Sequence, residues 1–530
     1  MIVDLEKAGS DYPIHGDVCI VGAGAAGISL AIELAGRGVN VTLLESGGLQ
    51  SEPATQALYG SELSGLRHNG VHTGRFRVLG GTTTQWGGQI LELDPENFDV
   101  RPWIPRSGWP FSKSVLAPYY SRAIELEGLS TALLDDDAVW KSLKVPVPIF
   151  GNSLTPFFTR WCPEPDFTRV FGTKLSENEH IAIYLHANVC GITMNENRDA
   201  IAGLRCRTLG GREFSVSART YVLCLGGIET ARLLLQPLEH GTCGPWNASG
   251  RVGRFFQDHI DSTLIKVLPR NRHQLHRWFD NVYRGKFKYH PKLKLAFSEQ
   301  KRLGCLSIGA TFVFQTKRSE SLSEFREAAK KLRRGVLGAR QAARLIRRLP
   351  DASLFLRQAI RLKLEGRAYN PDDEGIFLRV HCEQSPNTQS QITLASDRDA
   401  LGMFRCRLDW QVGELEIATI RHFAATVGKA FKQDFADIEP LPDLEQGGPS
   451  LTSRFEDSNH HMGATRMAVA SHEGVVDPNL RLHGVHNGYV CSSSVFPSGG
   501  FSNPTHTLIA LAVRLAWHLA GTGNGHAVSA

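Results

Sequence analysis

Residues 18–27 read VCIVGAGAAG, and this stretch decides the fold class of the 530-residue chain. The apolar run 18–21 predicts a buried strand. The glycines after it predict a tight turn into a helix, because apolar residues recur at helical spacing over 28–35. A second strand is expected over 39–44, ending at Glu45. A strand, a glycine turn, a helix and a strand closed by an acid are typical of a dinucleotide-binding unit.

Each of the three motif glycines has a specific structural role. Gly22 permits the tight turn, Gly24 lets the backbone approach a pyrophosphate, and Gly27 lets the helix pack closely on the strand. The helix N-terminus presents free N–H groups to the phosphates. We expect Glu45 to accept hydrogen bonds from ribose hydroxyls and to disfavour a 2′-phosphate, which argues against NADP. This unit alone does not distinguish FAD from NAD.

The composition is that of an ordinary globular protein, with 42% hydrophobic and 21% charged residues and a net charge of +6. The length predicts two packed domains. Ten cysteines without C-x-x-C spacing indicate a reducing compartment and neither a disulfide framework nor a metal site. Residues 1–16 do not resemble a signal peptide, and no run of eighteen apolar residues occurs. We therefore expect a cytoplasmic protein.

Four further segments resemble the glucose-methanol-choline (GMC) oxidoreductase family. They are LGGTTTQWGG at 79–88, the GWP-containing stretch 108–120, the strand–Gly-Gly–helix pattern within 187–232, and the block 460–505 with HHMGATRM and SNPT. The resemblance covers most of the chain outside 265–375.

This resemblance implies an α/β FAD-binding Rossmann-like domain, discontinuous in sequence, and an α+β substrate domain with a mainly antiparallel sheet and a helical insertion. The expected segments are FAD-binding parts at 1–110, 181–262 and 453–530, connecting and substrate-domain elements at 111–180, and the substrate-binding domain at 263–452 with a basic helical insertion at 317–367.

Within the family, the pattern around Trp86 and the Asn-Pro-Thr ending are most similar to the pyranose oxidase branch and to relatives acting on sugars and glycosides. Members that tether their flavin carry a histidine where this chain has Gln85, so the resemblance implies non-covalent FAD. Many members have an aspartate where Ser492 stands. The expected cofactor-binding residues are Gly22, Ala23, Gly24, Ala26, Gly27, Glu45, Ser46, Arg77, Gly80, Gly81, Thr82, Thr83, Gln85, Trp86, Gly87, Gly88, Val189, Gly226, Gly227, Thr230, Ser493, Ser494, Val495, Asn503, Pro504 and Thr505.

Alcohol oxidation requires a base that removes the hydroxyl proton, and a neutral histidine suits that role. The resemblance places the base at His460 and a second hydroxyl-orienting group at Asn503. From the residues alone, either could be a core or capping residue. A one-residue slip of register would exchange His460 with His461, and His506 is a further catalytic or supporting candidate. His259 is interpreted as structural or supporting.

Residues 263–315 and 374–412 are predicted to be largely strands of an antiparallel sheet, because apolar residues alternate over 306–314, 376–380, 392–394 and 404–410. The stretch 417–431 predicts a helix.

The insertion 317–367 is predicted to form helices over 322–346 and 354–364. It contains fifteen Lys and Arg residues and five Asp and Glu residues, a net charge of +10. It either covers the active site with a solvated basic face outward, or docks on anionic lipid or an acidic substrate. Nucleic acid is disfavoured, because aromatic residues are nearly absent there.

The leading hypothesis is oxidation of a secondary alcohol of a sugar or glycoside, with oxygen, a quinone or a redox protein as electron acceptor. One alternative is oxidation of a lipid-linked or natural-product alcohol at a membrane. The other is a non-redox GMC-like lyase that retains FAD.

Overall fold

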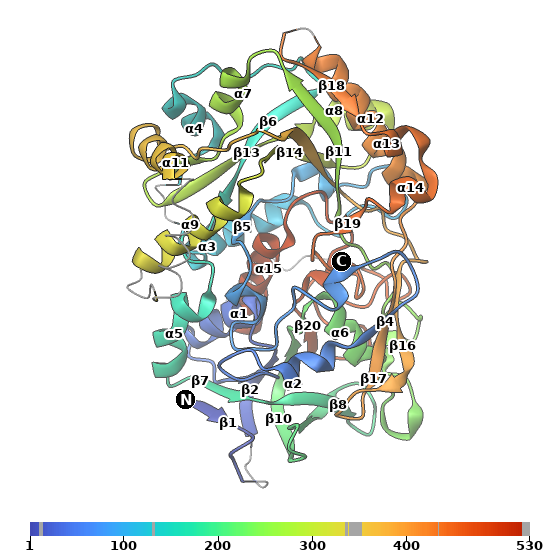
Figure 1. Cartoon of the computed structure of the whole chain (residues 1–530). Coiled ribbons are helices and arrows are strands. Elements are labelled where there is room, and N and C mark those ends of the chain that lie inside the picture. The colour runs from blue at the N-terminus through green and yellow to red at the C-terminus, as the bar shows by residue number, and fades with distance from the viewer. Residues whose placement is uncertain (10–13, 130–132, 334–337, 339–351, 433, 522–530) are drawn as a thin grey trace.

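The protein is described here from a computed structural model covering residues 1–9, 14–129, 133–333, 338, 352–432 and 434–521. Two large sheets lie at opposite ends of the molecule, with the helix α15 (Pro504–Leu519) between them (Figure 1). This arrangement matches the expected pair of domains, one built on a largely parallel sheet and the other on an antiparallel sheet.

The first sheet has the strand order β1–β7–β3–β2–β10–β9–β8, with β20 also paired to β10. Strands β1, β7, β3, β2, β10 and β20 are mutually parallel. Strands β9 and β8 extend the sheet with antiparallel pairing. Parallel strands place their carboxyl ends at one edge, where ligands of such sheets bind. The bounds are β1 (Ile2–Asp4), β2 (Ile14–Val21), β3 (Val41–Leu44), β7 (Ile181–Leu185), β8 (Asn188–Met194), β9 (Ile201–Arg207), β10 (Glu213–Leu223) and β20 (Gly488–Val490).

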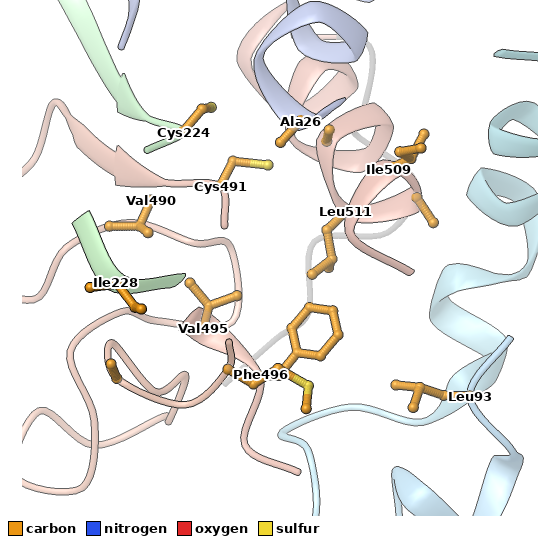
Figure 2. Close-up of a cluster of buried hydrophobic side chains, with 14 of the residues drawn as sticks. Ala26, Leu93, Cys224, Ile228, Val490, Cys491, Val495, Phe496, Ile509 and Leu511 are labelled. Atoms are coloured by element: carbon orange, nitrogen blue, oxygen red, sulfur yellow. The ribbon is translucent and has the colours of Figure 1, made fainter. Parts of the chain in front are cut away.

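The core of this part joins segments that are far apart in the chain. Helix α1 (Ala25–Ala35) packs against α15, and side chains from both helices meet those that follow β10 and β20 (Figure 2). Cys224, Cys491 and Leu511 belong to this buried cluster. The C-terminal segment is therefore built into the same core as the N-terminal glycine unit.

The second sheet is antiparallel, in the order β18–β11–β15–β14–β13–β6–β5. Strands β12 and β19 pair at its margins. One face is covered by α12 (Glu414–Phe431), where Phe312 packs on Phe431. The bounds are β5 (Gln89–Ile90), β6 (Leu154–Trp161), β11 (Ile260–Pro269), β12 (Val282–Arg284), β13 (Phe287–Leu295), β14 (Ile308–Gln315), β15 (Gly375–Cys382), β18 (Ala436–Pro440) and β19 (Glu456–Asp457).

Alternation along β15 turns the neighbouring side chains away from α12. Arg379 and His381 occupy the opposite face of this strand, and the His381 ring lies 4.5 Å from that of His259 and 5.5 Å from that of His460. This face of β15 therefore lies next to His259 and His460.

The expected strands form, but two of them leave the expected sheet. Strand β16 (Gln391–Arg398) pairs with β17 (Phe404–Asp409), and β17 also pairs with β4 (Ser61–Leu63), in a separate small sheet. Period-two alternation shows that one face is covered without showing which sheet the strand joins, so the single-sheet expectation was wrong. The stretch 263–315 also contains α7 (Arg272–Phe279) and α8 (Phe297–Leu303), which the strand prediction missed.

The basic insertion begins with α9 (Ser319–Arg333) and ends with α11 (Ala352–Glu365). The second helix is thus confirmed. Most of the rest of the predicted first helix lies at 334–337 and 339–346, outside the described residues. Among the described helices, none is long and apolar enough to cross a membrane. The remaining helices are α2 (Pro53–Gln56), α3 (Ala117–Leu126), α4 (Asp136–Leu143), α5 (Phe167–Glu177), α6 (Gly226–Leu235), α13 (Pro442–Gln446) and α14 (Gly448–Thr452).

Candidate active site

The turn after β2 contains two glycines required by packing and one that faces open space. Gly22 has φ +105°, and a Cβ there would lie 2.5 Å from the Cys224 carbonyl oxygen. A Cβ on Gly27 would lie 1.9 Å from the Gly22 oxygen. At Gly24, by contrast, an added Cβ meets no atom of the described residues within 4 Å. The open position lines a pocket, as the close approach of a pyrophosphate requires.

Glu45 lies at the end of β3 and is almost completely buried. One carboxylate oxygen accepts a hydrogen bond from the Ala23 backbone N–H at 3.0 Å, and the other accepts one from the Gly47 N–H at 2.9 Å. Burial raises the pKa of this carboxyl, and the two backbone donors oppose that effect. The acid therefore fixes the glycine turn and also lines the pocket beside it.

The second glycine segment packs directly on the first. The Gly80 N–H donates to the Ala23 oxygen at 2.9 Å, and a Cβ on Gly81 would lie 2.9 Å from the Gly24 Cα. The turn continues as a short 3-10 helix over 81–84. The two segments together form one wall of the pocket.

Most of the expected cofactor residues line this pocket. Those that do are Gly22, Ala23, Gly24, Ala26, Glu45, Ser46, Arg77, Gly81, Thr82, Thr83, Trp86, Val189, Gly226, Gly227, Ser493, Pro504 and Thr505. The pocket lining does not include Gly27, Gly80, Gln85, Gly87, Gly88, Thr230, Ser494, Val495 or Asn503.

A cluster of buried charges on the pocket wall was largely missed by sequence reasoning. Arg75 and Arg77 donate to the two carboxylate oxygens of Glu229 at 3.0 and 2.9 Å, and Arg232 donates to Glu229 at 3.1 Å. Burial opposes ionisation of Glu229, but the three arginines outweigh it and lower its pKa to about 2. The i,i+3 spacing of Glu229 and Arg232 in α6 was the available signal, although their arginine partners come from a distant loop.

His460 and Asn503 are brought together from segments 43 positions apart. Asn503 is the N-cap residue of α15, yet its side-chain Nδ2 donates to Nε2 of His460 at 3.0 Å rather than capping the helix. Its Oδ1 accepts a hydrogen bond from Gln89 at 2.9 Å. Burial and the nearby His381 lower the pKa of His460 to about 3, so its imidazole is neutral near pH 7. His460 also lines the dinucleotide pocket.

The two other candidate histidines occupy different surroundings. His461 lines the pocket too, but its ring packs against Phe256 and its Nε2 lies 3.7 Å from the Asp258 carboxylate. His506 is buried and its Nδ1 lies 2.7 Å from a Glu127 carboxylate oxygen. Only His460 of the three forms the hydrogen bond with Asn503.

Two long segments of the chain match known protein families. An FAD-dependent oxidoreductase family model matches residues 17–245, and a GMC oxidoreductase model matches residues 386–512. The chain belongs to the GMC oxidoreductase family. Formate oxidase from Aspergillus oryzae has the same fold, with a TM-score of 0.56 at 17% identity, over 96% of this chain and 99% of that one.

Two relatives of this GMC oxidoreductase align over nearly its whole length, and a third aligns over a shorter part. The 2-methyl-1,2-propanediol dehydrogenase of Mycolicibacterium austroafricanum is 22% identical, covering 94% of each chain. The 6'''-hydroxyparomomycin C oxidase of Streptomyces lividus is 22% identical, covering 96% of this chain and 93% of its own. The C-glycoside 3-oxidase of Microbacterium trichothecenolyticum is 28% identical over 27% of each chain. The protein is thus an FAD-dependent enzyme acting on CH–OH donors.

Proposed function

We propose that this GMC oxidoreductase oxidises a secondary alcohol of a sugar or glycoside to a ketone. The observation that carries the proposal is the His460–Asn503 pair, joined at 3.0 Å, with His460 on the wall of the dinucleotide pocket. The sugar assignment is supported by the motif pattern around Trp86 and by relatives named as a C-glycoside oxidase and the large subunit of a fructose dehydrogenase.

Nε2 of His460 receives the hydroxyl proton once the substrate hydroxyl replaces Asn503 at its single lone pair, and Asn503 then orients the hydroxyl. FAD, held along the glycine pocket, would supply the hydride acceptor, so that loss of one proton to His460 and of one hydride from the same carbon leaves a carbonyl. Because His460 is neutral, it is ready to act as a base without first losing a proton. Oxygen, a quinone or a redox protein would serve as the final electron acceptor.

The residues present fit FAD. Gly24 and Gly226 leave open space where a Cβ would stand, so the backbone can closely approach a diphosphate. Glu45 is placed to accept hydrogen bonds from the ribose, while Arg77 supplies positive charge at the same wall.

We infer that FAD is bound without a covalent bond. Gln85 is exposed, and a glutamine amide lacks the nucleophilic nitrogen of the histidine that stands there in flavin-tethering relatives. Acid denaturation should therefore release the yellow colour into the supernatant. Colour that remains with the precipitated protein would contradict non-covalent binding.

The substrate class is tested by mixing the holoenzyme anaerobically with a panel of sugars, glycosides and lipid-like alcohols. A sugar or glycoside should bleach the flavin absorbance, and His460→Gln should slow this bleaching at least about 100-fold. If only lipid-like alcohols bleach the flavin, the sugar assignment is wrong. If conversion proceeds without any flavin reduction, the enzyme is a lyase.

An anionic membrane surface is a second proposed partner, and the exposed face of α11 supports it. Leu356, Ile360 and Leu364 follow one another at four-residue spacing on α11, and all three are exposed. The surrounding insertion 317–367 has a net charge of +10, which suits an anionic lipid surface. The holoenzyme should co-sediment with phosphatidylserine vesicles and not with phosphatidylcholine vesicles, and Ile360→Asp/Leu364→Asp should abolish this. Equal sedimentation of the variant would refute the contact.

A cytoplasmic location and the five-segment domain division stay proposals. All ten cysteines lie within the described residues and are free, and eight of them are buried, as expected in a reducing compartment. The proposed FAD-binding segments are 1–110, 181–262 and 453–530, although β5 in the first of these and β19 in the last pair into the antiparallel sheet.

A further inference from the structure

A second imidazole stands directly behind the proposed base. His259 follows Gln257-Asp258, is completely buried, and has its Nδ1 2.8 Å from Nδ1 of His460. Its other ring nitrogen, Nε2, lies 2.8 Å from the carbonyl oxygen of Gly500. The His259 ring is therefore held at both nitrogens.

The chemistry of the partners determines where the hydrogens are. A carbonyl oxygen only accepts, so Nε2 of His259 carries a hydrogen and donates it to Gly500. Burial and the neighbouring His381 lower the pKa of His259 well below its usual value, so the ring is neutral. Its Nδ1 therefore carries no hydrogen and offers a lone pair. Nδ1 of His460 must then donate to that lone pair. In neutral His460, the remaining lone pair lies on Nε2, which accepts from Asn503.

We propose that His259 is a positioning residue that holds His460 in the Nδ1–H tautomer, so that the basic nitrogen faces the substrate hydroxyl. This inference rests on the proposed role of His460 as the base. Without an acceptor behind it, His460 could place its hydrogen on Nε2, and the lone pair would then point away from the reacting group.

The Gly500 carbonyl is itself firmly placed. Gly500 has φ +54°, and a Cβ there would lie 2.4 Å from the Asn97 side chain, so only glycine fits. Its N–H donates to Glu383 at 3.3 Å, and Glu383 is paired with the buried Arg101 at 2.7 Å. The ion pair thus fixes the carbonyl that selects the tautomer.

The backbone of both histidines is fixed by a single carboxylate. Oδ1 of Asp258 accepts the N–H of His259 at 2.7 Å and that of His460 at 2.9 Å. Asp258 is completely buried, and its other oxygen lies 3.1 Å from Nε2 of His68. The two rings therefore keep their relative position without a contact from the substrate.

A neutral partner differs from the carboxylate found behind many catalytic histidines. A carboxylate would stabilise the imidazolium and raise the pKa of the base, whereas His259 orients His460 without adding negative charge. The base then stays unprotonated in acid and returns its proton readily after the reaction.

Two substitutions of His259 separate tautomer selection from packing. In His259→Asn the side-chain oxygen can take the place of Nδ1 and still accept from His460. In His259→Leu no acceptor remains, although the volume is similar. Anaerobic flavin reduction should slow at least about tenfold in His259→Leu, since a wrong tautomer costs up to about 10⁴-fold in serine proteases. It should stay within about threefold of wild type in His259→Asn.

The direct readout is the protonation pattern of the ring, which needs no substrate. Two-bond ¹H–¹⁵N spectra of the ¹⁵N-histidine-labelled holoenzyme, with His460→Gln to assign the signal, should show His460 as Nδ1–H in wild type and His259→Asn. His259→Leu should lose that pattern. An Nε2–H form of His460 in the wild type, or an unchanged pattern in His259→Leu, would overturn the proposal.

A metal ion is the rival explanation of the same geometry, because one ring nitrogen of each of His259, His381 and His460 lies within 4.8 Å of the others. Elemental analysis of the purified holoenzyme should find less than about 0.1 equivalent of zinc, iron, copper or manganese. One equivalent of metal in the wild type that is absent from His259→Leu would show a metal site and overturn the proposal. If no alcohol reduces the flavin while His460 is Nδ1–H, the proposed substrate fails and the tautomer assignment stands.

Discussion

Gly24→Ala should weaken cofactor binding without weakening the fold. Gly24 has φ −85° and ψ −164°, a conformation that alanine adopts without strain. An added Cβ meets no described atom within 4 Å, so nothing in the protein has to move. We therefore expect the stability of the apoprotein to change by less than about 0.5 kcal/mol.

The added methyl group should weaken only the binding of FAD. The methyl group projects from the pocket wall, where we expect the pyrophosphate to approach the backbone. One extra carbon in a close-packed contact costs about 1–3 kcal/mol. This free energy corresponds to FAD binding weaker by roughly 5- to 150-fold.

The assay is titration of apoprotein with FAD, followed by the quenching of flavin fluorescence, together with thermal unfolding of the apoprotein. Gly172→Ala in α5 is the matched control, because its Cβ also meets no described atom within 4 Å and the residue does not line the pocket. Gly27→Ala is the opposite case, because its Cβ would lie 1.9 Å from the Gly22 oxygen and should destabilise the fold itself. If Gly24→Ala binds FAD as tightly as the wild type, the pyrophosphate does not pass this glycine and the reasoning is wrong.

Three further outcomes are expected. His461→Gln should reduce its flavin with substrate far faster than His460→Gln, because only His460 bonds to Asn503; the reverse order in stopped-flow traces would show that the register is wrong. Since burial, with the nearby His381, lowers the pKa of His460 to about 3, the rate of flavin reduction should vary less than about twofold between about pH 5 and 8; a rate that falls with a midpoint near the free-histidine value would contradict this. Glu383→Gln leaves Arg101 buried without its charge partner and should lower the free energy of unfolding by about 3–5 kcal/mol in urea titrations, whereas a loss below about 1 kcal/mol would show that the pair contributes little.

The sequence predicted the nucleotide-binding part well because its signals are local. The strand, the glycines and the helix are consecutive. Gly22 and Gly27 each have a steric reason, in the residue that follows β10 and within the same unit, whereas Gly24 faces the open pocket. The strands at 391–409 were predicted as strands but placed in the wrong sheet, because alternation reports burial of one face and not the identity of the neighbour. The choice of sheet depends on pairing with β4, more than 300 residues away.

The proposed catalytic pair, His460 and Asn503, could be predicted only through the family resemblance. A histidine and an asparagine 43 positions apart carry no local pattern, and Asn503 would ordinarily be expected to cap the helix it precedes. The buried arginine cluster on Glu229 was missed for the same reason, since Arg75 approaches from a loop 154 positions away.

The role of His259 could not be read from any one segment, because it depends on where a backbone carbonyl points. The segment 500–503 approaches His460 from two directions: Asn503 bonds to Nε2 directly, and Gly500 acts on Nδ1 through His259. One short loop therefore sets both nitrogens of the proposed base. Because Gly500 bonds to Glu383 of the segment after β15, and Gln89 of β5 bonds to Asn503, the loop is aligned by the antiparallel sheet as well as by the nucleotide-binding part. A change in the packing of the two sheets would thus reach the base through the loop, even where no residue of the pocket is altered.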